Sequence, residues 1–177
     1  MICPFCQAIV IEGEDVCQEC SQPLTEVLST DSQKTRVEQN LESRSLSLLN
    51  PVEPVSVSPT TPVRDVIKLL GEKNIGCVLV VWCDALVGIF SERDALMKIG
   101  HRFEKLANEP IRHFMTPTPE TLSDQDSIAF ALNRMAVGDF RHVPIEQDEN
   151  PVGIVSVRDV LRYVTKQFPE ILTKTAT

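Results

Sequence analysis

The phrase "VGIFSERD" occupies residues 87–94, and the phrase "VGIVSVRD" occupies residues 152–159, 65 positions further along the chain. The segments around these phrases, residues 58–99 and 123–164, align with each other without a gap. Self-similarity at a fixed period indicates repeated structural units. Because 177 residues suffice for two or three small units, we expect two half-size units of matching structure.

Each copy contains an amphipathic helix. Thr61 followed by Pro62 predicts a capping residue and a proline at the first helical position, and Asp126 predicts the cap of the matching helix. Apolar residues then recur at the spacing of one buried helix face. They are Val63, Val66, Ile67 and Leu70 in the first copy and Ile128, Ala131, Leu132 and Met135 in the second.

The rest of each copy has the pattern of a short strand, a hairpin and a closing helix. The strands "PVSVS" and "ETLS" come first, and the stretches "CVLVVW", "LVGIF", "HVPIE" and "PVGIV" flank polar turns at Asp84 and at residues 148–150. The closing helices are "ERDALMKI" and "VRDVLRYV". One β-α-β-β-α unit leaves a sheet face uncovered. We therefore predict an α+β fold in which the two units pack about a pseudo-two-fold axis.

Four of the six cysteines form two C-x2-C hooks separated by ten residues, namely Cys3, Cys6, Cys17 and Cys20. Two such hooks suit a tetrahedral metal, and we predict a structural zinc site, with Gly13 and Asp15 in its turn. A redox pair, an iron centre and disulfides remain alternatives. Because this segment has so few apolar residues, we expect it to fold only with bound metal. Cys77 and Cys83 are interpreted as small buried apolar residues.

The sequence divides into five segments. Residues 1–24 resemble a small zinc ribbon, and residues 25–50 form a linker rich in Ser, Gln, Thr and Glu. A segment of such composition can bury little area. Two alternatives remain for it: a short helix around "RVEQNLESRSLSLL" that docks its leucines on the next domain, or plain disorder. Residues 51–112 and 113–170 are the two repeats, and residues 171–177 are a tail.

Charge and composition exclude several classes of function. The net charge is −8, and the first fifty residues carry eight acids against three bases, which argues against duplex nucleic acid as a partner. No apolar run reaches the roughly 18 residues of a membrane span, so we expect a soluble, cytoplasmic protein without a membrane segment. The sequence contains no nucleophile-base arrangement and no phosphate-binding loop, which predicts a protein that is not an enzyme.

The two phrases resemble the signature of CBS domains, and two in tandem resemble a Bateman module. The resemblance covers about residues 51–168 and extends to "FMTPTPETLS" and "FRHVPI". In this family the Ser or Thr and the Asp of the phrase contact the ribose of an adenosine ligand. The resemblance thus implies one site at Ser91 and Asp94 and another at Ser156 and Asp159. The same side chains also suit a helix cap, which needs no ligand.

The two implied sites differ in positive charge. Arg141 and His142 precede the hairpin of the second copy, where the first copy has Gly76 and Cys77. Basic residues at this place commonly contact phosphates in CBS pairs. The resemblance therefore implies unequal sites, with the better anionic subsite in the second copy. The glycine of each phrase is expected to let a ligand approach the backbone.

No effector domain accompanies the repeats, so the resemblance implies a stand-alone sensor. It would bind AMP, ADP, ATP, S-adenosylmethionine or an NAD-like ligand, and would modulate an unknown protein partner or its own assembly. The family further implies a homodimer. The alternative is a ligand-independent dimerisation scaffold whose zinc ribbon recognises a protein, or less readily nucleic acid.

Overall fold

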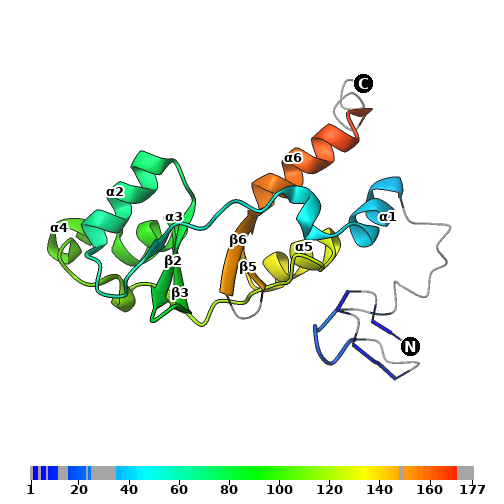
Figure 1. Ribbon diagram of the computed structural model, residues 1–177, viewed down its shortest axis with the longest axis horizontal. Coiled ribbons are helices and arrows are strands. Elements are labelled where there is room, and N and C mark those ends of the chain that lie inside the picture. Colours follow the sequence, from blue (N-terminus) through cyan, green and yellow to red (C-terminus); the bar gives the residue numbers. More distant parts are fainter. Residues whose placement is uncertain are drawn as a thin grey trace. The chain divides into compact units, whose positions relative to one another are not determined.

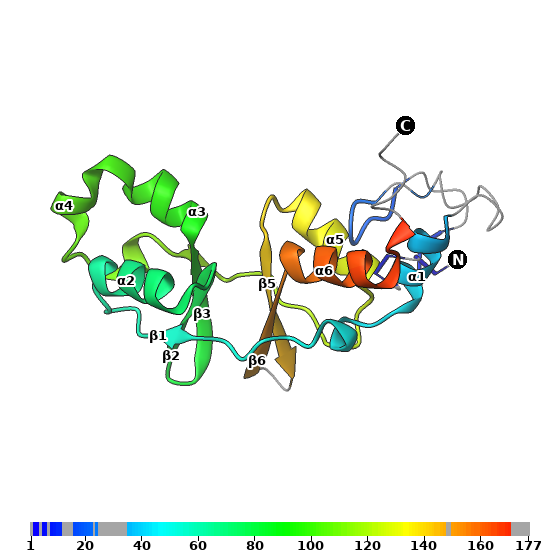
Figure 2. The same cartoon turned by 90° about the horizontal axis from the view of Figure 1, so that it is seen from above.

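The computed structural model describes residues 2–3, 5–6, 8–11, 16–22, 24, 35–147 and 150–170. It divides into two units, which we describe separately. Unit 1 contains residues 1–50, 124–141 and 156–177, and unit 2 contains residues 51–123 and 142–155 (Figures 1 and 2). The predictions for Gly13, Asp15 and the tail at residues 171–177 lie outside the described residues, as does most of the predicted turn at residues 148–150.

Unit 2 contains a four-stranded sheet in the order β1-β2-β3-β4. The strands are β1 Ser56–Val57, β2 Cys77–Trp82, β3 Ala85–Ser91 and β4 Thr116–Pro117. Strand β1 is parallel to β2, whereas β2, β3 and β4 are successively antiparallel. Cys83 and Asp84 join β2 to β3 with φ angles of 49° and 63°, the left-handed conformation of a tight hairpin turn. Cys83 is therefore exposed, and its predicted burial was wrong.

Helix α2, Val63–Lys73, packs beside this sheet (Figure 1). Its buried residues include Val63, Val66 and Leu70, as predicted, while Ile67 is partly buried. The predicted cap was wrong by one position, because Pro62 itself is the N-cap residue and no side chain caps the helix. Proline lacks an N–H group and has an extended φ/ψ here, so it fits the position before the first turn.

The chain after β3 is helical but irregular. It forms α3 Glu92–Asp94, the π-helical turn η3 Ala95–Ile99, η4 Gly100–Arg102, α4 Phe103–Leu106 and η5 Ile111–His113. Ile99 and Ile111 are buried in the same core as Phe90 and the α2 residues. The predicted closing helix of the first copy is thus present, with a π-turn in place of regular α-helix.

The second hairpin, β5 His142–Gln147 and β6 Asn150–Ser156, has the same neighbours as the first. Leu122 forms a parallel bridge with Ile145 of β5, as β1 does with β2. Val52 forms an antiparallel bridge with Ile154 of β6, as β4 does with β3. The leading segment of each repeat, at its first few residues, therefore pairs with the last strand of the other repeat. No pattern in the sequence predicted this exchange of leading segments.

Unit 1 is built from helices: α1 Arg36–Ser43, the 3-10 turn η2 Leu46–Leu49, α5 Ile128–Val137 and α6 Val157–Gln167. Ser127 caps α5 by accepting a hydrogen bond from the Phe130 N–H, so the cap predicted at Asp126 was wrong by one residue. Ile128 is fully buried on the predicted face of α5. Within the described residues, no helix combines the length and the apolarity that crossing a membrane requires.

The second half of the predicted linker is ordered against α5. Thr35 and Glu38 form a capping box at the start of α1. The Leu46 N–H donates to the Asp126 carbonyl at 2.9 Å, and the Leu46 side chain is fully buried. Of the two alternatives for this segment, the helix with a docked leucine is thus confirmed for residues 35–49, and residues 25–34 lie outside the described part of the chain.

Candidate functional site

The repeated phrase builds the same helix start twice. In the first copy, the Ser91 N–H and hydroxyl donate to Asp94 Oδ2 at 2.9 and 2.7 Å. In the second, the Ser156 N–H and hydroxyl donate to Asp159 Oδ2 at 2.9 and 2.6 Å. The two pairs cap α3 and α6. The helix cap expected of the phrase is therefore present in both copies, and each carboxylate keeps Oδ1 for another partner.

A backbone hydrogen bond fixes each cap to the start of its hairpin. The Glu92 N–H donates to the Gly76 carbonyl at 3.0 Å, and the Val157 N–H donates to the Arg141 carbonyl at 3.1 Å. Gly76 and Arg141 are equivalent positions of the repeat, as are Glu92 and Val157. The identical residues of the phrase thus encode identical local geometry in both units.

The glycines of the phrase accommodate the exchanged leading segments. A Cβ atom at Gly153 would lie 2.6 Å from Cβ of Pro51, and one at Gly88 would collide with Sδ of Met115. Each glycine is thus required by a close approach of the chain to itself. In the structure, Pro51 and Met115 lie at these positions, and the approach of a ligand to the backbone stays a prediction.

The Asp94 carboxylate in unit 2 is engaged on both oxygens. Lys98 Nζ lies 2.7 Å from Asp94 Oδ1, and the same ammonium donates to the Phe114 carbonyl at 2.9 Å and to the Thr116 hydroxyl at 3.2 Å. Partial burial raises the pKa of Asp94. Hydrogen bonds from Lys98 and Ser91 lower it by more than burial raises it, so the pKa lies below its ordinary value. A ribose at Asp94 would have to displace Lys98.

Acid should weaken the first repeat through this carboxylate. Because the pKa of Asp94 is lower in the folded state, its stabilising effect is present above the ordinary value of 3.8 and is lost as the pH falls through the folded value. We expect the free energy of unfolding to fall below about pH 4. The Lys98→Met variant should show a shallower fall in chemical denaturation between pH 5 and 2. An unchanged slope would contradict the contribution of this ion pair.

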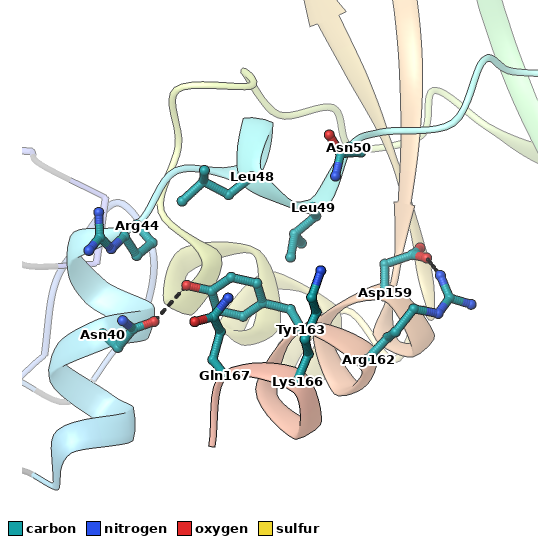
Figure 3. Close-up of a pocket in the computed structure, with 10 residues that line it drawn as sticks. All are labelled: Asn40, Arg44, Leu48, Leu49, Asn50, Asp159, Arg162, Tyr163, Lys166 and Gln167. Atoms are coloured by element: carbon teal, nitrogen blue, oxygen red, sulfur yellow. Dashed lines mark hydrogen bonds and ion pairs between the residues drawn. The ribbon is translucent and has the colours of Figure 1, made fainter. Parts of the chain in front are cut away.

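The Asp159 carboxylate in unit 1 faces a pocket. The pocket has a volume of about 370 Å³ and lies between α1, η2 and α6 (Figure 3). Arg162 donates to Asp159 Oδ1 at 3.1 Å, and Arg162 is 76% exposed. The pocket is lined by Asn40, Arg44, Leu48, Leu49, Asn50, Asp159, Arg162, Tyr163, Lys166 and Gln167. The ion pair of Asp159 is therefore solvated and easier to replace than that of Asp94.

The two basic residues predicted for the second copy do not line this pocket. Arg141 contributes its backbone carbonyl to the cap, as described above. His142 begins β5 in unit 2, where its ring lies against Gly76 so closely that a Cβ atom at Gly76 would collide with Nε2. The basic pocket residues are instead Arg44, Arg162 and Lys166. The sequence did not single them out, because two lie on the closing helix beyond the repeated phrase and one lies in the linker.

The four N-terminal cysteines converge in unit 1. Their sulfur atoms all lie within 4.8 Å of one another, with 3.7 Å between those of Cys3 and Cys20 and 3.6 Å between those of Cys6 and Cys17. A tetrahedral site with Zn–S bonds of about 2.3 Å has S···S edges of about 3.8 Å. The four sulfurs therefore fit a tetrahedral metal.

Two equivalent turns hold these sulfurs. The Cys3 N–H donates to the Ala8 carbonyl, and the Cys17 N–H donates to the Gln22 carbonyl, both at 2.8 Å. Burial raises the pKa of the Cys6 and Cys20 thiols. At Cys17 burial also raises the pKa, but hydrogen bonds from the Cys20 and Glu19 backbone outweigh it and lower the pKa to about 7. Thiolates are the form that binds metal.

Comparison with known proteins identifies relatives of the repeats. A model of the CBS domain matches residues 48–101 and 111–166. The chain is 30% identical over 117 residues to the mitochondrial CBS domain-containing protein CBSX3 of Arabidopsis thaliana, covering 63% of this chain and 57% of that protein. It is 33% identical over 120 residues to an uncharacterized 33.4 kDa protein of Thermofilum pendens, covering 65% and 38%. The chain thus spans less than two thirds of these relatives' own length.

Solved structures show the same fold. The CBS-domain protein ATU1752 from Agrobacterium tumefaciens superposes with a TM-score of 0.62 at 25% identity, covering 67% of this chain and 94% of that one. The structure of CBSX2 in complex with AMP has a TM-score of 0.60 at 23% identity, covering 71% of this chain and 98% of that one. The CBS domain pair of MJ0100 in complex with methylthioadenosine and S-adenosylmethionine has a TM-score of 0.61 at 20% identity, covering 70% of this chain and 98% of that one. The predicted α+β fold of paired CBS repeats is confirmed, and the chain belongs to the family of CBS-domain proteins.

Proposed function

We propose that this protein is a regulatory module, without catalytic activity of its own, that binds an adenosine-containing ligand at Asp159. The observation that carries the proposal is the pocket of about 370 Å³ beside a carboxylate that Ser156 holds in place. A fixed carboxylate accepts hydrogen bonds from the two hydroxyls of a ribose, as in dinucleotide-binding folds. The structures of CBSX2 with AMP and of MJ0100 with two adenosine compounds support this ligand class.

The two repeats would then bind unequally. Asp94 is held by Lys98, whose ammonium also bonds the Phe114 carbonyl and Thr116, whereas Asp159 has one exposed partner, Arg162. We assign the principal site to Ser156 and Asp159 and a weaker site to Ser91 and Asp94. Arg141 and His142, the phosphate contacts predicted from the sequence, do not line this pocket.

A calorimetric titration of the full chain with AMP, ATP, S-adenosylmethionine and NADH tests the proposal. We expect saturable binding of at least one ligand, a loss of affinity of at least tenfold in Asp159→Asn, and little change in the matched variant Asp94→Asn, because only the former faces the pocket. Asparagine preserves a capping oxygen at both positions. A folded wild type that binds none of the four ligands would contradict the proposal.

We further propose that Cys3, Cys6, Cys17 and Cys20 hold a structural zinc ion. All four positions of a tetrahedral shell are filled by protein sulfur, which is typical of structural rather than catalytic zinc. When bound, the metal would supply the cross-link that this segment's small core lacks. The segment would then be a rigid body carried by the regulatory module.

Exposed apolar side chains at matching positions support a homodimer. Leu96 in unit 2 and Leu161 in unit 1 are equivalent residues of the two closing helices, and they are 75% and 58% exposed. Met97 beside Leu96 is also exposed. Apolar residues at such positions are typical of a surface covered by a second copy. We infer that the homodimer forms through these helices, and Leu96→Glu together with Leu161→Glu should yield monomers in light scattering.

The runner-up function is a scaffold whose N-terminal segment recognises a protein. Four apolar side chains of this segment are exposed, namely Ile2, Ile9, Ile11 and Val16. Residues 1–24 contain four acids and no Lys or Arg, so the fitting partner is a basic, apolar protein segment. Empty adenosine sites together with ligand-independent dimerisation would favour this function over the sensor.

A further inference from the structure

The matching helices α2 and α5 differ in charge on one face. In α2 this face carries four exposed charged residues, namely Arg64, Asp65, Lys68 and Glu72. The residues 65 positions further along, on α5, are all uncharged, namely Ala129, Phe130, Asn133 and Val137. A helix at the surface of a protein normally keeps charged or polar residues on the face that points away from the core. The loss of all four charges therefore indicates that something other than water covers part of this face of α5.

The segment with the four cysteines supplies this cover. Its buried residues form one cluster, which consists of Cys3, Val10, Cys17, Cys20 and Leu24. Phe130, in the first turn of α5, packs against this cluster and is only partly exposed. The side chain of Asp65, at the matching position of α2, is 54% exposed. The cysteine segment and the second repeat thus share an apolar contact within unit 1.

Backbone contacts bring the chain from the cysteine segment to the same end of α5. The Ile128 N–H donates to the Arg44 carbonyl at 2.9 Å, and Ser45 forms an antiparallel bridge with Ser127. Helix α1 also packs against α5. Only residues 25–34 separate the last described residue of the cysteine segment from the cap of α1. So short a connection raises the effective concentration of the segment at α5, and a small contact suffices to hold it there.

We propose that the zinc-bound N-terminal segment is a metal-dependent cover of α5, seated on Phe130. The inference rests on the proposed zinc site and is independent of the adenosine pocket. Because the core of the segment consists largely of its cysteines, loss of the metal removes the structure that Phe130 contacts. The uncharged face of α5 is then exposed to water. Metal binding and docking are linked reciprocally, so the contact with Phe130 also raises the zinc affinity of the segment.

The cover makes the second repeat sensitive to the metal, because the first repeat has charged residues at the matching positions of α2. Cobalt(II) tests the contact directly. It suits the same tetrahedral thiolate ligands as zinc, and its unpaired electrons shift the NMR signals of nearby nuclei. We would load the full chain with Co²⁺, using the Zn²⁺ form as the diamagnetic reference. We expect paramagnetic shifts at the Phe130 ring and at the amides of the first turn of α5.

The variant Phe130→Asp introduces the residue that α2 has at this position. It should leave α5 itself folded, because an acidic residue three positions after the Ser127 cap suits a helix start. We expect the thiolate-to-cobalt absorption to persist and most of the paramagnetic shift in α5 to disappear. The zinc affinity, measured by competition with a chromophoric chelator, should fall by at least about tenfold, because the apolar contact is lost.

The matched control is Val137→Glu, which also introduces the acidic residue of α2. Val137 is 56% exposed, so this variant should keep both the paramagnetic shifts and the zinc affinity of the wild type. Four-thiolate cobalt absorption without any shift in α5 would overturn the cover and leave the metal site intact. Equal zinc affinities of the wild type and Phe130→Asp would also overturn it. A full chain that binds neither metal would contradict the zinc site and the cover together.

Discussion

Removal of zinc should unfold residues 1–24 while the CBS repeats stay folded. The core of this segment consists of Cys3, Cys17 and Cys20 together with Val10 and Leu24. Three of its five buried residues are thus proposed metal ligands. Structural zinc in such peptides contributes roughly 10–16 kcal/mol of binding free energy, which is also folding free energy. No comparable apolar area replaces it here, so chelation should abolish the fold of the segment.

Amide hydrogen exchange gives the direct measurement. We expect the Cys3 and Cys17 N–H groups, which donate to carbonyls in the folded segment, to lose protection on chelation, and amides of β2 and β3 to keep it. The Cys3→Ser variant should behave like the chelated protein. Cys83→Ser is the matched control, because Cys83 is exposed and outside the cluster. Native mass spectrometry should show one zinc per chain, and a mass lower by four hydrogens instead would indicate two disulfides and contradict the metal site.

The substitution Gly153→Ala should destabilise the protein, whereas Gly71→Ala should stabilise it. At Gly153 the new methyl group would lie 2.6 Å from Cβ of Pro51, part of a rigid ring, and overpacking of this kind costs roughly 1–3 kcal/mol. At Gly71, inside α2, a Cβ atom meets nothing within 4 Å. Alanine there should add about 0.5–1 kcal/mol through its higher helix propensity.

Urea denaturation measures the free energy of unfolding of both variants, and each variant replaces one glycine with alanine. The loss of stability at Gly153 follows from the exchange of leading segments, since Pro51 is the first residue of the first repeat and Gly153 belongs to the second. A Gly153→Ala variant as stable as the wild type would show that Pro51 does not lie against β6. Gly153→Val should lower the free energy of unfolding further, because a branched side chain needs still more of the space that Pro51 occupies.

The features that were predicted correctly depend on residues that are close together along the chain. The spacing of Val63, Val66 and Leu70 requires one helix face, and the same phrase gives the same cap at Ser91 and Ser156. The caps predicted for α2 and α5 were wrong by one residue, because neighbouring Thr, Pro, Asp and Ser residues all suit a helix start and local hydrogen bonding decides among them.

The features that the sequence did not predict depend on distant contacts. The exchanged strand β4 has only two residues, one of them proline, and has no strand periodicity to reveal it. The contact between Asn40 and Tyr163 joins residues 123 positions apart. Neither a motif nor a spacing links the linker to the last helix, so the pocket emerged only from the fold. Cys83 is exposed and not buried as predicted, because it lies in the tight turn after β2.

In the proposed function, the second repeat holds the ribose of an adenosine ligand at Asp159. Crystal structures of the zinc-loaded protein grown with AMP and with ATP would show where the ribose binds. We expect both ribose hydroxyls within hydrogen-bond distance of the Asp159 carboxylate, with Arg162 moved away from Oδ1. A ligand whose ribose lies at Asp94 alone, or a pocket at Asp159 that stays empty at saturating ligand, would contradict this binding site.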